Sequence, residues 1–423
     1  MGQRESATAS EPSVWRNTSF RLFLTARTVA VAGAAVSTIA LPLLVYDLTG
    51  SPLATSITTT GAVAPYLLFG FVAGAVADRT NRRAVMLTAQ ACASAALLSV
   101  PGASALGSLA AAHVIAVAFG IGTAFVWFDA AAFGALPQIV GRSALPAANG
   151  ALWTASTVAD VSVPAVAGLV IGVIGPAWAL GIDGASYVLA AALIAAATRR
   201  LPVVPRAGGP KPTVLTDIRE GLSFLRRHTL LCPLTFLGFG NSLAQGAVTS
   251  LLVVYARTQL GVEAEGPALG VIWTAVALGG LAAAVSVPRL GRRYRVGAIS
   301  IAAYATGTVA LVGVLVADGL TLALPALVVY SWAATCAILN GIGVRQQLTP
   351  DRLQGRVNTT ARMIAWGGTP LGAVGAGVIA QMSDVRSAYA AAVVCLGVTA
   401  VVAWCSPLRT HGDISRLLAE VAE

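Results

Sequence analysis

The sequence predicts an all-α polytopic membrane protein with twelve transmembrane helices arranged in two pseudo-symmetric bundles of six. Three observations lead to this fold class. Of the 423 residues, 57% are hydrophobic and only 10% are charged, whereas soluble domains carry about 25% charged residues. The apolar residues are gathered in long segments, and the second half of the chain repeats features of the first.

Twelve segments are long and apolar enough for a bilayer-crossing helix, which needs about 20 mainly apolar residues. We expect spans at 22–46, 52–77, 84–106, 108–130, 147–173, 176–198, 228–256, 266–288, 296–316, 321–344, 357–380 and 387–406. Pro42, Pro65, Pro164 and Pro370 lie within four of them. We expect kinks there, because proline survives in lipid only where neighbouring helices or a cavity satisfy the freed backbone groups.

The polar segments divide the chain into five parts. We expect a cytoplasmic tail at 1–21, a first bundle at 22–198, a linker at 199–227, a second bundle at 228–406 and a cytoplasmic tail at 407–423. The first tail lacks the apolar core of a cleavable signal peptide, so the first helix is expected to remain as an anchor. The linker opens with Pro and Gly and becomes amphipathic from Thr216, which predicts a short helix on the inner membrane surface.

The basic residues lie in short clusters between apolar runs, which is the pattern of loops kept in the cytoplasm. With both termini inside, nearly all of the 27 Lys and Arg residues lie on the inner side; Arg27 and Arg362 fall within spans. We therefore expect a multi-pass protein of the bacterial cytoplasmic membrane. A net charge of +10 would suggest nucleic acid as the partner of a soluble chain, but this distribution indicates the lipid bilayer instead.

The two halves repeat at a nearly constant offset. Segment 138–149 is matched by 347–358, with Gln and Asn at the same two places and an Arg shifted by one position, and Arg82-Arg83 is matched by Arg292-Arg293. Two pairs with almost the same offset indicate a duplicated six-helix unit. Parallel repeats of six spans are typical of transporters, whose substrate site lies between the halves near the midplane.

The loop after the second span contains Gly74, Asp78, Arg79, Arg82 and Arg83 in the order G-x-x-x-D-R-x-x-R-R. Glycine lets another helix approach closely, and the carboxylate can accept hydrogen bonds across an interface between halves. An ordinary basic loop would explain the arginines but not the acid among them. We interpret the five residues as a gating latch.

This pattern resembles the signature of the major facilitator superfamily. Segments 20–27, 41–56, 128–140, 145–150, 183–191 and 361–377 further resemble the branch of macrolide-efflux and enterobactin exporters. The resemblance implies a monomeric secondary transporter that exports a small amphiphilic drug or natural product by alternating access. It also implies antiport driven by the proton gradient, without a bound cofactor. The antiporter signature of the fifth span is only partly kept, as Pro164 and Gly168.

Four charged residues are candidates for coupling or for the cavity, because an ionised side chain inside a span is costly. Asp160 lies deep in the fifth span, on the same helix face as Pro164, and is either a proton-coupling or cation-binding residue or a permanently paired structural acid. Arg27 and Arg362 either extend to the headgroups, pair with Asp129 or Asp160, or line the cavity. Asp129 is expected at the inner end of the fourth span, in an interface.

Polar and aromatic residues inside the spans are candidates for substrate contacts. Asn241 and Gln245 share a helix face, and neither they nor Asn340 should face lipid, where amides stay unpaired. The aromatic candidates for stacking on an amphiphile are Tyr66, Trp153 and Trp366.

Other functions fit the sequence less well. It contains no G-x-x-x-x-G-K-[ST] motif, which excludes a self-contained ATP-driven pump. The three histidines and five cysteines have no metal-ligand spacing, so neither a metal site nor a membrane-embedded enzyme is expected. A proton symporter that imports its solute, a uniporter and a receptor without transport remain as alternatives.

Overall fold

The computed structural model describes residues 14–77, 80–141, 144–199, 214–262, 267–350 and 353–411. Over these ranges the chain is helical and contains no strand. The helices are η1 (Val14–Arg16), α1 (Thr18–Thr49), α2 (Pro52–Ala77), α3 (Arg82–Ala105), α4 (Ala111–Val140), α5 (Leu145–Ile174), α6 (Pro176–Ala197), α7 (Val214–Arg227), α8 (Leu231–Thr258), α9 (Pro267–Arg293), α10 (Val296–Leu315), α11 (Leu320–Leu348), α12 (Gln354–Trp366), α13 (Gly368–Met382), α14 (Val385–Cys405) and α15 (Leu408–His411).

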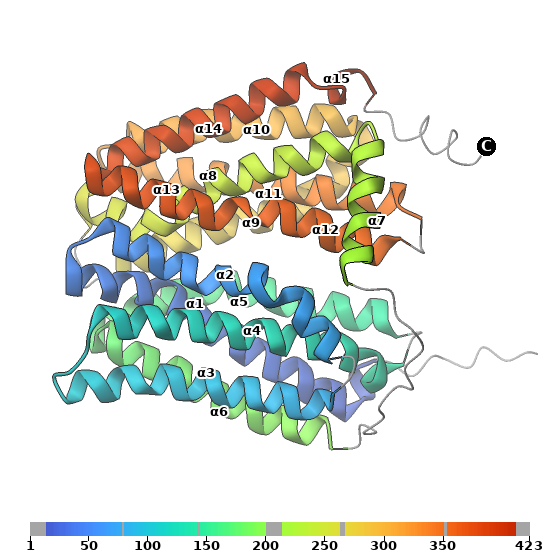
Figure 1. Ribbon diagram of the computed structural model, residues 1–423. Helices are drawn as coiled ribbons and strands as arrows, with labels where there is room; N and C mark the ends of the chain where they lie inside the picture. Colours follow the sequence, from blue (N-terminus) through green and yellow to red (C-terminus); the bar gives the residue numbers. More distant parts are fainter. Residues whose placement is uncertain are drawn as a thin grey trace, which may run out of the picture.

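The helices form two bundles (Figure 1), with α1–α6 in one, α8–α14 in the other and α7 across one end. Corresponding pairs pack in both: α1 on α5 and α8 on α13, α2 on α4 and α9 on α11, α3 on α6 and α10 on α14. The bundles meet where α5 packs on α9 and α2 on α13. The predicted all-α fold class is confirmed. The end that carries η1 and α7 is called the linker end below, and the opposite end the far end.

Ten helices of the described ranges are long and apolar enough to cross a membrane, and α5 would be an eleventh. One of the ten, Thr360–Met382, combines the end of α12 with α13. The remaining predicted span corresponds to α2, which is not among these helices. The number of twelve spans therefore stays a prediction.

The helix boundaries follow from local chemistry. Asn17, Asn81 and Asp384 are N-caps whose side chains accept hydrogen bonds from the first turns of α1, α3 and α14, which satisfies backbone donors without an intrahelical partner. One of the predicted kinks is seen as a bend, and a second of the four prolines follows a break between two helices. The α5 helix bends by 43° next to Pro164, and α12 ends four residues before Pro370, whose ring would clash with the carbonyl of Trp366.

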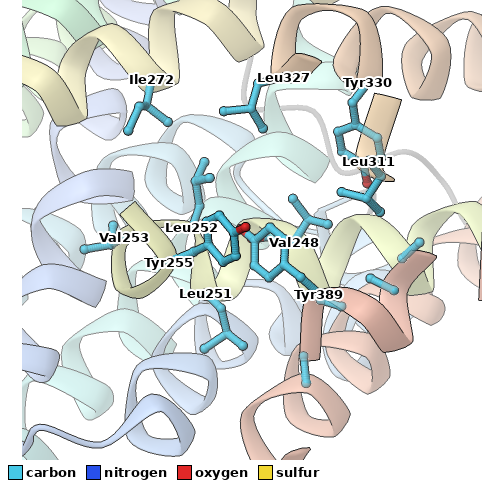
Figure 2. Packing of buried hydrophobic residues seen from close by; sticks show 14 of the residues in the cluster. Val248, Leu251, Leu252, Val253, Tyr255, Ile272, Leu311, Leu327, Tyr330 and Tyr389 are labelled. Atoms are coloured by element: carbon cyan, nitrogen blue, oxygen red, sulfur yellow. The ribbon is translucent and has the colours of Figure 1, made fainter. Parts of the chain in front are cut away.

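The second bundle has an aromatic core near the far end (Figure 2). The rings of Tyr255 on α8 and Tyr389 on α14 stack with their centroids 3.9 Å apart. Their hydroxyls donate to the backbone carbonyls of Val314 and Val248 at 2.9 and 3.0 Å. Because both buried hydroxyls are satisfied, the two rings join α8, α10 and α14 without leaving an unpaired polar group.

Glycines bring α8 and α13 into close contact. A Cβ added at Gly372 would lie 1.9 Å from the carbonyl oxygen of Leu243, and one at Gly246 would lie 2.0 Å from that of Thr369. Only glycine fits at these positions, as expected where helices associate through small residues. This contact fixes the position of α12 and α13 against α8, and thereby one wall of the cavity described next.

Candidate functional site

A cavity of about 210 Å³ lies between α8, α10, α11 and α12. Three of the predicted residues line it, Asn241, Arg362 and Trp366, and Arg345 and Tyr304 join them. Arg362 connects the cavity to the other bundle: its guanidinium lies 4.8 Å from the ring centroid of Tyr66 on α2 and 5.0 Å from that of Trp366. The structure thus brings Tyr66, Arg362 and Trp366 together where the two bundles face each other.

The other two predicted amides lie elsewhere. Asn340 donates from its Nδ2 to the carbonyl of Val296 and to the hydroxyl of Ser300, both at 2.9 Å. These bonds hold α10 against α11. Gln245 is half-buried on α8 and is not among the residues that line the cavity. Neither amide lines the cavity described above, and their role in substrate contact stays a prediction.

Arg345 is the cavity residue that sequence reasoning missed. The predicted span ended at residue 344, so Arg345 counted as one more basic residue of an inner loop. In the structure α11 continues to Leu348, and Arg345 is only 8% exposed. The available signal in the sequence was its position. Arg345 continues the helical spacing of the apolar residues before it, which form a buried helix face.

The charged residues of the first bundle form a pair. Arg27 on α1 lies 3.6 Å from the carboxylate of Asp129 on α4, and its guanidinium is 5.3 Å from the ring centroid of Phe128. Both side chains are partly exposed. Of the roles considered for Arg27, the structure shows pairing with Asp129, and the pair joins two helices of the same bundle.

Asp183 is a second residue that the candidate set omitted. It is completely buried in α6, and its carboxylate accepts hydrogen bonds from the hydroxyls of Ser37 and Ser186. It borders a cavity of about 250 Å³ that is lined mainly by apolar residues of α1, α2 and α4. The bond from Ser37 joins α6 to α1, whereas Ser186 belongs to α6 itself.

Asp160 and Trp153 belong to α5, but their side chains lie outside the described residues. Pro164 and Gly168 are buried on the same helix, and α5 bends next to Pro164. The coupling role of Asp160 and the cavity role of Trp153 therefore stay predictions.

Asp78 and Arg79 of the predicted latch also lie outside the described residues. Arg82, the first residue of α3, donates to the carbonyl of Gly134 on α4 at 2.6 Å. The buried Nε of Arg83 has no hydrogen-bond partner in the described part of the chain. A Cβ added at Gly74 would meet no described atom within 4 Å. In this conformation no described helix uses the close approach that Gly74 permits.

The hydrogen bonds and the ion pair that join described residues of the two bundles lie at the far end. Arg257 at the end of α8 forms an ion pair with Asp47 at the end of α1. The Ser51 hydroxyl donates to the side-chain oxygen of Gln381 at 2.8 Å, and the hydroxyls of Ser56 and Ser250 are 3.4 Å apart. The bundles are thus fastened together at the far end, which is the arrangement of a carrier closed on that side.

Comparison with known proteins identifies the family. The family model described as transmembrane secretion effector matches residues 9–417. The chain belongs to this family of major facilitator transporters. It is 27% identical over 398 residues to the multidrug efflux pump Tap of Mycolicibacterium fortuitum, covering 90% of this chain and 94% of that protein. It is 26% identical over 396 residues to the enterobactin exporter EntS of Salmonella paratyphi A, covering 88% of each.

A solved structure shows the same fold. The bacterial homologue of the human lysosomal transporter Spinster, in an inward-facing and occupied conformation, aligns with a TM-score of 0.73 at 14% identity. The alignment covers 96% of this chain and 98% of that one. The resemblance to the superfamily and its efflux branch is confirmed, and the protein is a multi-pass membrane transporter rather than an enzyme.

Proposed function

We propose that this transporter exports a small amphiphilic compound, a drug or a natural product, from the bacterial cytoplasm by alternating access. The observation that carries the proposal is the meeting of Tyr66 of the first bundle with Arg362 and Trp366 of the second. A compound held there touches both bundles, so rocking them against each other changes the side from which it is reached. The export direction is supported by the similarity to Tap and EntS.

The proton gradient is proposed as the energy source, through antiport and without a bound cofactor. Asp160 is the proposed proton-coupling residue, because it lies on the helix face of Pro164, where α5 bends. A change in its protonation would therefore act on the segment of α5 that alters direction. The proposed partners are the substrate and the lipid bilayer, with no nucleic acid, and the transporter is proposed to be a monomer.

The proposed location is the cytoplasmic membrane with both termini in the cytoplasm. Arg226 and Arg227 at the end of α7 and Arg292 and Arg293 at the end of α9 are exposed at the linker end. A cluster of exposed arginines is expected on the cytoplasmic side. The fastened far end would then face outward, and the conformation would be open to the cytoplasm.

Proton flux in liposomes tests the proposed function. The purified protein is reconstituted with a pH dye inside, amphiphilic natural products are added, and Asp160→Asn is compared with the unchanged protein. We expect compound-triggered proton movement that the variant loses, because an amide cannot exchange a proton at this pH. Asp318→Asn is the matched control, since it removes an exposed carboxylate from a loop and should leave the flux unchanged.

The outcomes separate the alternatives. Compound movement without proton movement would indicate a uniporter, and proton and compound movement in the same direction would indicate an importing symporter. Compound binding without any flux would indicate a receptor. Asp160→Asn with the original flux and pH dependence would contradict the coupling role.

A further inference from the structure

The cavity beside α11 holds two arginines that have no acidic partner among the described residues. Arg345 is 8% exposed, its Nε is buried without a hydrogen-bond partner, and Arg362 makes its described contacts with aromatic rings. Among the described residues, no carboxylate lies within ion-pair distance of either guanidinium. Buried charges are normally paired, because the lost hydration must be replaced. The cavity is therefore electrostatically incomplete as it stands.

The remaining polar groups of the cavity can all donate hydrogen bonds. The amides of Asn241 and Gln346 and the hydroxyls of Ser242 and Tyr304 line it together with the arginines. Gln346 is exposed, and the other three side chains are almost completely buried. A set of donors and two positive charges matches a negatively charged acceptor. It matches a cationic compound poorly, because no described acid is present to receive one.

The position of Arg345 in the last turn of α11 does not by itself explain its burial. A positive charge is favourable at a helix C-terminus, but an exposed arginine serves that purpose equally well. Arg292 and Arg293 in the last turn of α9 are both exposed. Arg345 instead lies in the wall of the cavity. Its positive charge is therefore largely shielded from bulk water and borders the cavity.

Apolar and aromatic groups complete the cavity. Leu234, Ile338 and Ile342 form part of its wall, and the rings of Tyr66 and Trp366 lie 5.4 Å apart beside Arg362. Trp366 is 40% exposed and thus available for stacking. At about 210 Å³ the cavity is smaller than drug-sized pockets, which measure about 300–1,000 Å³. It suits the charged end of a compound whose body extends toward the rings.

We propose that Arg345 and Arg362 bind the acid group of an amphiphilic organic anion, a carboxylate or a group of the same shape, while its apolar body lies against Tyr66 and Trp366. Arginine suits this role because its planar fork can donate two parallel hydrogen bonds to a carboxylate. This inference rests on the proposed function, since it identifies the anion with the exported compound.

Two matched fluorescent probes test the proposal by binding alone. The full-length protein in phosphatidylcholine nanodiscs is titrated with dansylglycine, which carries a carboxylate, and with dansylglycinamide, which is neutral. We expect dansylglycine to bind at least about tenfold more tightly, as a charge-assisted hydrogen bond typically provides. Equal affinities for the two probes would overturn the proposal without any variant.

Variants then show which residues cause the preference for dansylglycine over dansylglycinamide. Arg345→Gln and Arg362→Gln should each reduce this preference for the carboxylate, and the double variant should bind both probes equally, with an unfolding midpoint close to that of the unchanged protein as evidence of an intact fold. Arg345→Lys should keep part of the preference, because the charge remains. Arg409→Gln is the control: it removes an arginine that lies 4.4 Å from the ring of Trp404, away from the cavity. A preference that survives in the double variant would overturn the proposal.

An anionic lipid headgroup has the same chemistry, and a second arm separates it from the transported compound. If phosphatidylglycerol in the nanodiscs displaces dansylglycine, the arginines hold lipid and the assignment to the exported compound falls. Unchanged affinity supports the assignment. The flux experiment remains independent: export of neutral or cationic compounds without an anion preference would contradict this inference and leave the proposed function standing.

Discussion

At the scale of single residues, Asp183 and Arg345 show two fates of a buried charge. The carboxylate of Asp183 is completely buried, but hydroxyls from Ser37 and Ser186 donate to it. The Nε of Arg345 is also buried and has no such partner among the described residues. A satisfied buried charge holds helices together, whereas an unsatisfied one calls for an explanation such as a functional role. This contrast is why the further inference concerns Arg345 and not Asp183.

A residue-scale prediction concerns Asp384, the exposed N-cap of α14. Its carboxylate accepts a hydrogen bond from the backbone N–H of Ser387 at 2.6 Å, and hydrogen bonds from Ser387 hold the pKa of Asp384 below its ordinary value. Asp384→Ala should lower stability near neutral pH by about 1 kcal/mol, a typical value for an N-cap. Thermal unfolding of the purified protein in detergent measures this difference.

The same residue predicts a pH dependence. A group whose pKa is lowered by folding stabilises the protein above its unfolded pKa, about 3.9 for Asp, and loses that contribution as the pH falls through the folded-state value. The difference between Asp384→Ala and the unchanged protein should therefore shrink below about pH 4. Asp384→Asn keeps a cap without the charge and serves as control. A difference that stays constant down to low pH would contradict the role of the carboxylate.

At the scale of helices, small residues decide how closely α8 and α13 pack. Gly246, Gly368 and Gly372 all face backbone atoms of the opposite helix at distances that exclude a Cβ. Such contacts stabilise helix pairs in lipid through close packing rather than through the hydrophobic effect. They also place α12, which carries Arg362 and Trp366, against the cavity.

Gly372→Ala should therefore destabilise the protein by about 1–3 kcal/mol, the usual cost of overpacking. The added Cβ would lie 1.9 Å from the carbonyl oxygen of Leu243, which is backbone and cannot rotate away. Gly375→Ala on the same helix is the matched control, because a Cβ there meets no described atom within 4 Å. Unfolding midpoints in detergent compare the two, and equal values would show that α8 and α13 separate freely.

At the scale of the whole molecule, polar contacts at the far end hold the two bundles together. The ion pair between Asp47 and Arg257 joins the end of α1 to the end of α8, and Arg257 also lies 5.4 Å from the ring centroid of Tyr46. An alternating-access cycle has to break these contacts when the far end opens. Their strength therefore sets part of the balance between the two conformations.

Removing the ion pair should shift this balance toward a conformation open at the far end. Spin labels on Leu48→Cys and Thr258→Cys, in a protein whose exposed Cys92 and Cys405 are serine, report the distance between the bundles. Arg257→Gln should broaden the distribution toward longer distances, and the exchange Asp47→Arg with Arg257→Asp should restore it. Asp318→Asn, a far-end change outside the pair, should have no effect. An unchanged distribution in Arg257→Gln would show that the ion pair does not hold this end closed.

The sequence by itself determined the all-α membrane fold and the family, because hydrophobic length, charge distribution and the G-x-x-x-D-R-x-x-R-R motif are local properties of the chain. It also identified Asn241, Arg362, Trp366 and Tyr66, since polar and aromatic residues within spans are few. The tertiary structure decided which of these meet. Asp47 and Arg257 form an ion pair although they are 210 positions apart. The amide of Asn340 donates to the hydroxyl of Ser300. Arg345 lines the cavity because α11 extends past its predicted end. Such pairings depend on how each helix is rotated in its bundle, and packing between distant segments sets that rotation.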